Sequence, residues 1–135
     1  VMLQTAAAEC GLACVAMIAN YHGHRFDLPS LRRRCSVSLK GATLKGVMTI
    51  GAALQLQARP VKVALESLHT LTLPCVLHWD MTHFVVLKEV TRDGLVIHDP
   101  ALGAVPMTME RASRHFTGIA LELTPRSDFA SVINS

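Results

Sequence analysis

Cysteine and histidine are the residue types in this chain that suit covalent catalysis, and Cys10 has the most suggestive surroundings. It precedes Gly11 and stands where a helical pattern of apolar residues begins. Free N–H groups and partial positive charge at a helix N-terminus favour the thiolate, the nucleophilic form of cysteine. Position alone leaves open the alternative that Cys10 is a small buried residue, like Cys14 one helical turn further on.

A nucleophilic cysteine needs a base, and a third group must hold that base in one tautomer. His83 opens an apolar run that is predicted to be a strand, and Asp99 closes the next run. A turn at residues 92–94 would pair the two strands, so the start of one would lie beside the end of the other. We therefore predict His83 as the base and Asp99 as its orienting group. His78 could face the same cleft, although simple packing explains a histidine within a strand equally well.

Acyl transfer also requires hydrogen-bond donors for the oxyanion that forms on the attacked carbonyl group. Two donors are plausible near Cys10. One is its own backbone N–H at the expected helix start, and the other is the side-chain amide of Gln4 in the segment that leads into the helix. An isolated glutamine in a loop is usually solvated, so Gln4 is informative only together with the other residues.

The first half of the chain has helical periodicity and the second half has the pattern of strands. Helices are expected over residues 9–21, 28–34 and 43 to about 57, and strands over residues 60–64, 74–79, 83–90, 95–99 and 118–123, with a helical turn at 66–68 and a short helix over 109–115. Helices first and an antiparallel sheet second is an α+β arrangement. One core is expected between the helical layer and the sheet.

The composition fits one compact domain, because the chain has 135 residues of which 50% are hydrophobic and 17% are charged. A net charge of +3 without a long basic run gives no reason to expect a nucleic-acid partner. No apolar stretch reaches the roughly 18 to 20 residues that span a bilayer. The four cysteines form no C-x-x-C pair and are expected to be reduced, and neither a metal nor a cofactor is predicted.

Three segments together resemble the motifs of a known family. Residues 4–14 hold a glutamine, four residues, an acidic residue and then Cys-Gly; residues 83–87 read His-Phe-Val-Val-Leu; and residues 99–103 read Asp-Pro-Ala-Leu-Gly. Their types and order resemble those of the C39 family of cysteine peptidases, and the resemblance covers residues 3–125. One such motif would be weak, whereas three in register form a specific signal.

The resemblance implies a papain-like fold and a function. C39 domains remove leader peptides from bacteriocin or microcin precursors after a double-glycine motif, on the cytoplasmic side of peptide-exporting ABC transporters. By this likeness Cys10 is the nucleophile, His83 the base, Asp99 the orienting group and Gln4 an oxyanion donor. We further expect Trp79, Gly11 and Tyr21 to contact the substrate.

The same likeness suggests an organisation. Residues 1–125 are expected to form the peptidase domain, and residues 126–135 a polar linker toward a transmembrane domain outside this chain. The expected partners are a precursor peptide with a double-glycine leader and the transmembrane and nucleotide-binding domains of the same transporter. The isolated domain is expected to be monomeric.

Three alternatives stay open on the sequence. The first is a catalytically silent module of the same fold that binds a leader peptide, and the second is another cysteine acyl-transfer enzyme, since papain-like folds host several chemistries. The third is a structural Cys/His metal site, which the spacings disfavour. Motifs of serine hydrolases, zinc proteases and nucleotide-binding folds are absent from the sequence.

Overall fold

The computed structural model describes residues 2–23, 43–81, 83–99 and 103–126, with residues 2–9 described in their backbone only. The described elements, in chain order, are α1 (Met2–Tyr21), α3 (Leu44–Ala53), β1 (Leu56–Lys62), the 3-10 helix η2 (Leu65–Thr70), β2 (Cys75–Trp79), β3 (His83–Val90), β4 (Gly94–Asp99), β5 (Gly103–Thr108), α4 (Met109–Ser113) and β6 (Phe116–Pro125). The helix expected over residues 28–34 lies outside the described residues.

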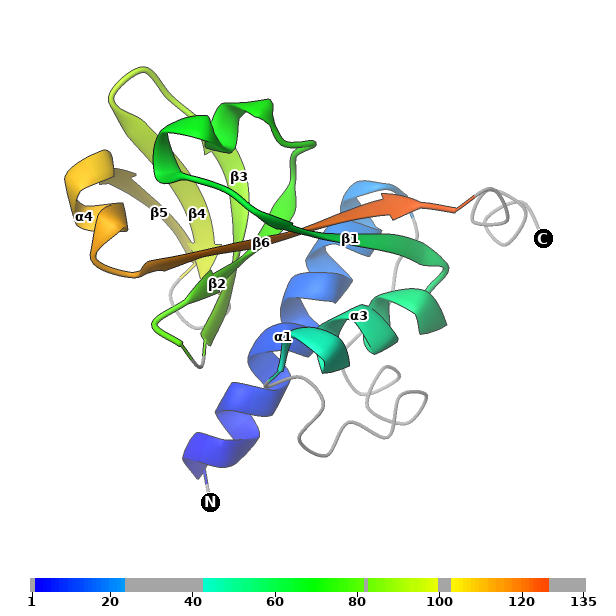
Figure 1. Cartoon of the computed structure of the whole chain (residues 1–135). Helices are drawn as coiled ribbons and strands as arrows, with labels where there is room; N and C mark the ends of the chain where they lie inside the picture. The colour runs from blue at the N-terminus through cyan, green and yellow to red at the C-terminus, as the bar shows by residue number, and fades with distance from the viewer. Residues whose placement is uncertain (1, 24–42, 82, 100–102, 127–135) are drawn as a thin grey trace.

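The strands form one antiparallel sheet in the order β1-β6-β2-β3-β4-β5. The tight turn expected between β3 and β4 is confirmed, because the Thr91 N–H donates to the Gly94 carbonyl at 2.8 Å. Helices followed by an antiparallel sheet give the α+β architecture that the sequence predicted (Figure 1).

Helix α1 is longer than the sequence pattern suggested. It begins at Met2 rather than at Glu9, so the expectation of a loop before Cys10 is wrong. Ala6, Ala7 and Ala8 carry the highest helix propensity, and no glycine or proline interrupts the first nine residues. The helix therefore extends N-terminally beyond its apolar stripe.

The boundary between α3 and β1 also differs from the prediction. Thr43 caps α3 as expected, since its side chain accepts a hydrogen bond from the Gly46 N–H at 3.0 Å. The helix ends at Ala53 rather than near Gln57, because Gln55 adopts a left-handed conformation with φ 65°. The chain is thus free to enter β1 at Leu56, four residues earlier than expected.

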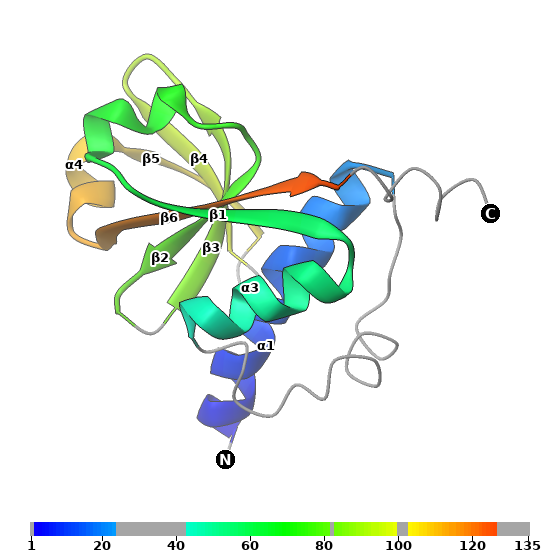
Figure 2. The ribbon, with the colours of Figure 1, turned by 45° about the vertical axis from the view of Figure 1, so that its right-hand side comes forward.

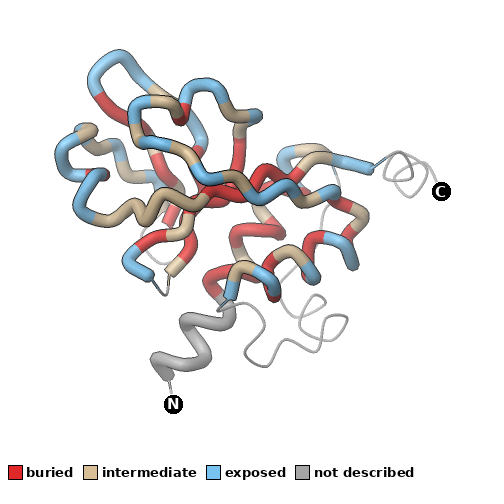
Figure 3. Tube along the Cα trace, viewed as in Figure 1, coloured by how far each residue is buried: buried red, intermediate tan, exposed pale blue. Residues whose placement is uncertain are grey.

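The sheet has a hydrophobic core on each face, which corrects the expectation of a single core. Helices α1 and α3 cover one face, whereas η2 and α4 lie on the other side of the sheet (Figures 1 and 2). Strand β3 supplies both cores, with Phe84 and Val86 toward α1 and Val85 and Leu87 in the second core. A strand buried on both faces reads as a continuous apolar run, as β3 does. The buried segments lie where α1 crosses the sheet and along its central strands (Figure 3).

The two outermost strands, β1 and β5, each carry a proline. Pro60 pairs with Leu121 of β6, and Pro106 pairs with Val96 of β4. Proline cannot donate a ladder hydrogen bond and is tolerated at sheet edges. No strand was predicted from the sequence over the residues of β5.

Candidate active site

The sulfur of Cys10 meets the start of β3 where α1 crosses the sheet. Cys10 is 3% exposed, and its Sγ lies 3.1 Å from Nδ1 of His83. The backbone of Phe84 contacts the same sulfur twice: its N–H donates at 3.2 Å, and its carbonyl oxygen lies 2.7 Å away. The N–H contact suits a thiolate and the carbonyl contact suits a thiol, so the site can hold both protonation states of the nucleophile.

His83 and Asp99 are neighbours, as the hairpin argument predicted. The other ring nitrogen of His83, Nε2, lies 3.1 Å from Oδ2 of Asp99. In the register of β3 and β4, Val86 pairs with His98, so Asp99 stands at the level of Val85. Val85 is two residues from His83 in β3, and Asp99 therefore lies diagonally across from His83 on the same face of the sheet. The Asp99 side chain is 12% exposed and the His83 side chain 31%. The carboxylate is thus held in place while the imidazole stays accessible to a substrate.

The nucleophile and the base approach each other from opposite faces of the sheet. Cys10 belongs to the core under α1, whereas His83 lies at the end of β3 next to Phe84, and neighbouring strand residues point to opposite faces. At the end of the strand the His83 ring nevertheless reaches Cys10, with Nδ1 3.1 Å from Sγ. The triad therefore exists only because α1 packs across the end of the β3–β4 hairpin.

The surroundings favour an ion pair between Cys10 and His83. A hydrogen bond from the Cys14 thiol, together with those from His83 and Phe84 and the charge of His83, lowers the pKa of Cys10 to about 5, although burial acts in the opposite direction. Its bond to Cys10, helped by the charge of that sulfur and by Asp99, raises the pKa of His83 to about 9 against the effect of burial. Thiolate and imidazolium thus coexist near neutral pH.

Cys10 does not owe its thiolate to a helix N-terminus, which corrects the sequence-based argument. It lies eight residues beyond the start of α1, and the favourable charge of a helix end falls off within the first turn. The Cys10 N–H likewise belongs to the ladder of helical hydrogen bonds, so it does not serve as the oxyanion donor expected at a free helix end.

Cys14 is the residue that sequence reasoning missed. It stands four residues after Cys10 in α1, so the two side chains share a face of the helix, and Cys14 is fully buried. Burial, the hydrogen bond to Cys10 and nearby negative charge raise the pKa of the Cys14 thiol well above its usual range. It therefore stays protonated and serves as a donor to the nucleophile. The i, i+4 spacing was the available signal.

Gln4 lies in α1, not in an entry loop, and its side chain is outside the described residues. Positions 4 and 10 are about one and two-thirds turns apart, and such positions do not share a face of a helix. A role for Gln4 at the oxyanion therefore stays a prediction, and it requires the chain before Cys10 to change conformation.

A pocket of about 320 Å³ opens beside His83 on the face opposite α1; we call it the imidazole-side pocket. It is lined chiefly by Trp79, His83, Ile97, Asp99, Val105 and Met107. Trp79 thus lines the same pocket as the base, and its contact with a substrate stays a prediction. Asp80, Arg111 and His115 also border this pocket.

The turn between β2 and β3 carries His83 and is fastened at several points. Asp80 and Met81 adopt left-handed conformations with φ 51° and 67°, which are uncommon for such residues. Nε2 of His78 lies 2.8 Å from the Met81 carbonyl, and Nδ1 lies 2.8 Å from Oγ1 of Thr117. His78 therefore holds the turn that positions the base, and its contacts do not place it in the catalytic group.

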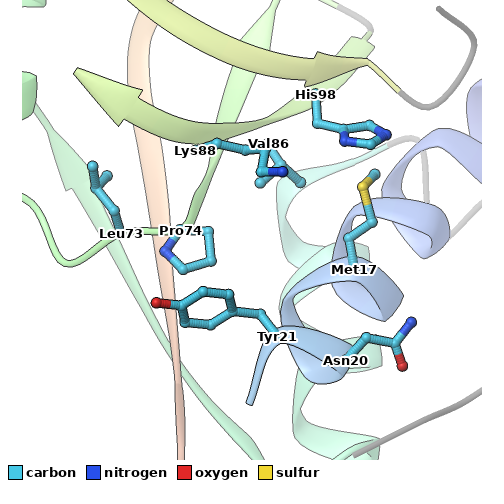
Figure 4. A pocket seen from close by; sticks show the side chains of 8 residues that line it. All are labelled: Met17, Asn20, Tyr21, Leu73, Pro74, Val86, Lys88 and His98. Atoms are coloured by element: carbon cyan, nitrogen blue, oxygen red, sulfur yellow. The ribbon is translucent and has the colours of Figure 1, made fainter. Parts of the chain in front are cut away.

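Tyr21 and Gly11, the other predicted substrate contacts, do not join the triad. Tyr21 is 68% exposed at the end of α1, eleven residues from Cys10. It lines a second pocket of about 400 Å³, the α1 pocket, together with Met17, Asn20, Leu73, Pro74, Val86, Lys88 and His98 (Figure 4). Gly11 is buried in α1 beside Cys10, and the described lining of neither pocket includes it.

Comparison with known proteins identifies the family of the chain. The model of the Peptidase C39 family matches residues 1–128. The chain belongs to this family. It is 48% identical over 131 residues, 97% of its length, to the colicin V secretion/processing ATP-binding protein CvaB of Escherichia coli. The chain spans only 19% of that relative.

Solved structures of C39 domains share the fold. One is a double glycine motif protease from an AMS/PCAT transporter in complex with a leader peptide, with TM-score 0.79, 37% identity and coverage of 87% of this chain and 85% of that one. Another is the peptidase domain of Streptococcus ComA, with TM-score 0.76, 26% identity and coverage of 87% and 91%. The papain-like fold expected from the sequence is confirmed.

The helices in the described part of the chain include none with the length and hydrophobicity of a membrane span.

Proposed function

We propose that this chain is a cysteine endopeptidase domain that cleaves bacteriocin or microcin precursors after a double-glycine leader, within a peptide-exporting ABC transporter. The observation that carries the proposal is the chain of contacts from Cys10 Sγ to His83 and from His83 to Asp99, each 3.1 Å. Such a triad is the machinery of a peptidase, which argues against a module that only binds leaders. The relatives named for secretion and processing support the substrate class.

The reaction follows from the contacts. The Cys10 thiolate attacks the carbonyl carbon of the second glycine, and the imidazolium of His83 then protonates the departing amine. Asp99 accepts the Nε2–H hydrogen bond and holds the ring so that Nδ1 faces the sulfur. Water, activated by the now neutral His83, hydrolyses the thioester and releases the leader. Gln4 is the oxyanion donor in this proposal, with the conformational change noted above.

The α1 pocket is the proposed docking site for the leader upstream of the glycines. It lies on the α1 face of the sheet, which is also the face of Cys10, and its walls include the apolar side chains of Met17, Leu73 and Val86 (Figure 4). Tyr21 projects an exposed ring beside them and would contact an apolar helix face of the leader. This gives Tyr21 a substrate role away from the scissile bond.

The organisation of the whole protein is part of the same proposal. Residues 1–125 form the peptidase domain, and residues 126–135 lead toward the transmembrane domain of a transporter whose nucleotide-binding domain lies elsewhere. The match of the family model to residues 1–128 supports this division. The domain would face the cytoplasm, where the precursor is made, and would be monomeric in isolation.

The decisive experiment incubates the reduced domain with a synthetic double-glycine-leader precursor, beside a Cys10→Ala control. Mass spectrometry should find one cut, after the second glycine, and none in the control. A precursor that stays intact with the folded wild-type domain, despite measurable binding, would instead support the leader-binding module.

A further inference from the structure

The imidazole-side pocket lies beyond His83 as seen from the sulfur. His83 and Asp99 are part of its wall, whereas the described lining does not include Cys10. Trp79 and Ile97 belong to the core on the face opposite α1, so the pocket opens on that face. The α1 pocket, on the other face, is bordered by a different set of side chains.

The chemistry of the cut assigns a side to each half of the substrate. After attack, the acyl half stays on Cys10 Sγ, while the amine half receives a proton from Nδ1 of His83. The leaving nitrogen, and the residue that carries it, must therefore lie on the imidazole side of the sulfur. The imidazole-side pocket has this imidazole in its wall, so it adjoins the side on which that residue lies.

The walls favour an apolar side chain. Trp79 and Ile97 are 4% and 2% exposed, and Val105 and Met107 add further apolar surface from β5. A volume of about 320 Å³ is small for a ligand pocket, which suits one side chain rather than a long segment.

The polar groups at the rim satisfy one another. Oδ1 of Asp80 lies 2.8 Å from Nδ1 of His115, and the His115 ring stacks on Trp79 with 5.3 Å between centroids and 10° between planes. Arg111 at the same rim is exposed to solvent. These groups do not create a buried charge that calls for a charged partner.

We propose that the imidazole-side pocket binds the side chain of the first residue after the cleaved bond and selects an apolar residue there. The inference rests on the proposed function and deepens it. The double glycine would set the position of the cut, and this pocket would make the rate depend on how the mature peptide begins.

The test uses synthetic precursors with one double-glycine leader and leucine, glycine, aspartate or lysine directly after the second glycine. The wild-type domain should cleave the leucine peptide with a kcat/KM about tenfold above that of the glycine peptide, because a buried apolar side chain contributes selectivity of this order. The aspartate and lysine peptides should not exceed the glycine peptide.

Two pocket variants and one control locate the effect. Val105→Phe fills the pocket and should bring the leucine-to-glycine ratio close to one while the glycine peptide is still cleaved. Met107→Ala enlarges the pocket and should raise kcat/KM for a tryptophan peptide relative to the leucine peptide. Met48→Ala makes the same replacement at a half-buried methionine of α3 that lines neither pocket, and it should leave both ratios unchanged.

The outcomes separate the two proposals. Cleavage of all four peptides at equal rates by the wild type, or a leucine preference that Val105→Phe and Met107→Ala leave intact, would overturn the pocket assignment alone. No cleavage of any peptide by the folded wild type would overturn the proposed function, and the pocket assignment with it.

Discussion

Two histidine–aspartate pairs lie in the described part of the chain, and they differ in exposure and in the other contacts of each imidazole ring. His115 and Asp80 are the closer pair, at 2.8 Å, but their side chains are 35% and 50% exposed. His83 and Asp99 are 3.1 Å apart, and the Asp99 side chain is 12% exposed. A short distance therefore does not identify the catalytic pair.

The two pairs differ in what else each imidazole ring contacts. His83 turns Nδ1 to the sulfur of Cys10, so the pair is the end of a chain that reaches a nucleophile. His115, which follows the end of α4, instead stacks on Trp79 and contacts Asp80 in the turn after β2. The same two residue types thus orient a base in one place and hold a loop in the other.

The comparison is tested most strongly at Asp99. Asp99→Asn keeps the size of the side chain but removes the charge that stabilises the imidazolium and sets its tautomer. We expect kcat to fall about 10²- to 10⁴-fold. Steady-state cleavage of a double-glycine precursor measures this, with circular dichroism to confirm the fold. A loss of less than about fivefold would mean that Asp99 does not orient the base.

The pH dependence gives the next largest effect. With the pKa of Cys10 near 5 and that of His83 near 9, kcat/KM should be flat between these values. Below pH 5 the thiolate is protonated, and above pH 9 the imidazolium loses the proton that the leaving amine needs. The rate should therefore fall about tenfold per pH unit beyond either limit.

Alkylation of Cys10 by iodoacetamide isolates the acid limb of this profile. Its rate should rise with a midpoint near pH 5 in the wild type and lose that midpoint in His83→Ala. A midpoint at the ordinary pKa of a cysteine in the wild type would rule out the ion pair.

Cys14 provides a smaller, sharper test. Cys14→Ala removes the thiol that donates to Cys10, so the pKa of Cys10 should rise. On the acid limb of the pH profile, kcat/KM should fall about tenfold for each pH unit of that rise. Cys14→Ser retains a donor and should restore part of the loss. Cys75→Ala is the matched control, because Cys75 is an equally buried thiol in the core on the opposite face. An unchanged alkylation midpoint in Cys14→Ala would remove Cys14 from the site.

The smallest effect on kcat is expected at the Asp80–His115 pair. Asp80→Asn, matched to Asp99→Asn, should change kcat by no more than about threefold and the free energy of unfolding by less than about 1 kcal/mol, because exposed ion pairs contribute little. Urea unfolding and the same cleavage assay measure both quantities. A loss comparable to that of Asp99→Asn would show that the Asp80–His115 contact also sets the position of His83.

The sequence predicted those parts of the site that depend on pattern and register. His83 and Asp99 follow from one hairpin, because a recognisable turn between two apolar runs brings the start of one strand near the end of the next. Strand β3 also matched its prediction, since a strand buried on both faces leaves an unbroken apolar run.

The remaining features depend on competition between local signals and on contacts across the fold. The alanines before Cys10 suit helix as well as loop, so the start of α1 was misplaced. Pro106 obscured β5, because only its edge position makes a proline acceptable there. Cys14 did have a local signal, its spacing of four residues from Cys10 in one helix, but a pattern of apolar residues does not show that the two thiols share a hydrogen bond.

The prolines at the two edges of the sheet have a consequence for how the domain meets other chains. Pro60 and Pro106 interrupt the donors on β1 and β5, the two strands through which an extended peptide would add to the sheet. An extended peptide therefore finds poor edges for strand pairing on this sheet. The same interruption disfavours stacking of neighbouring copies edge to edge into aggregates, which matters for a sheet whose central strand is apolar on both faces.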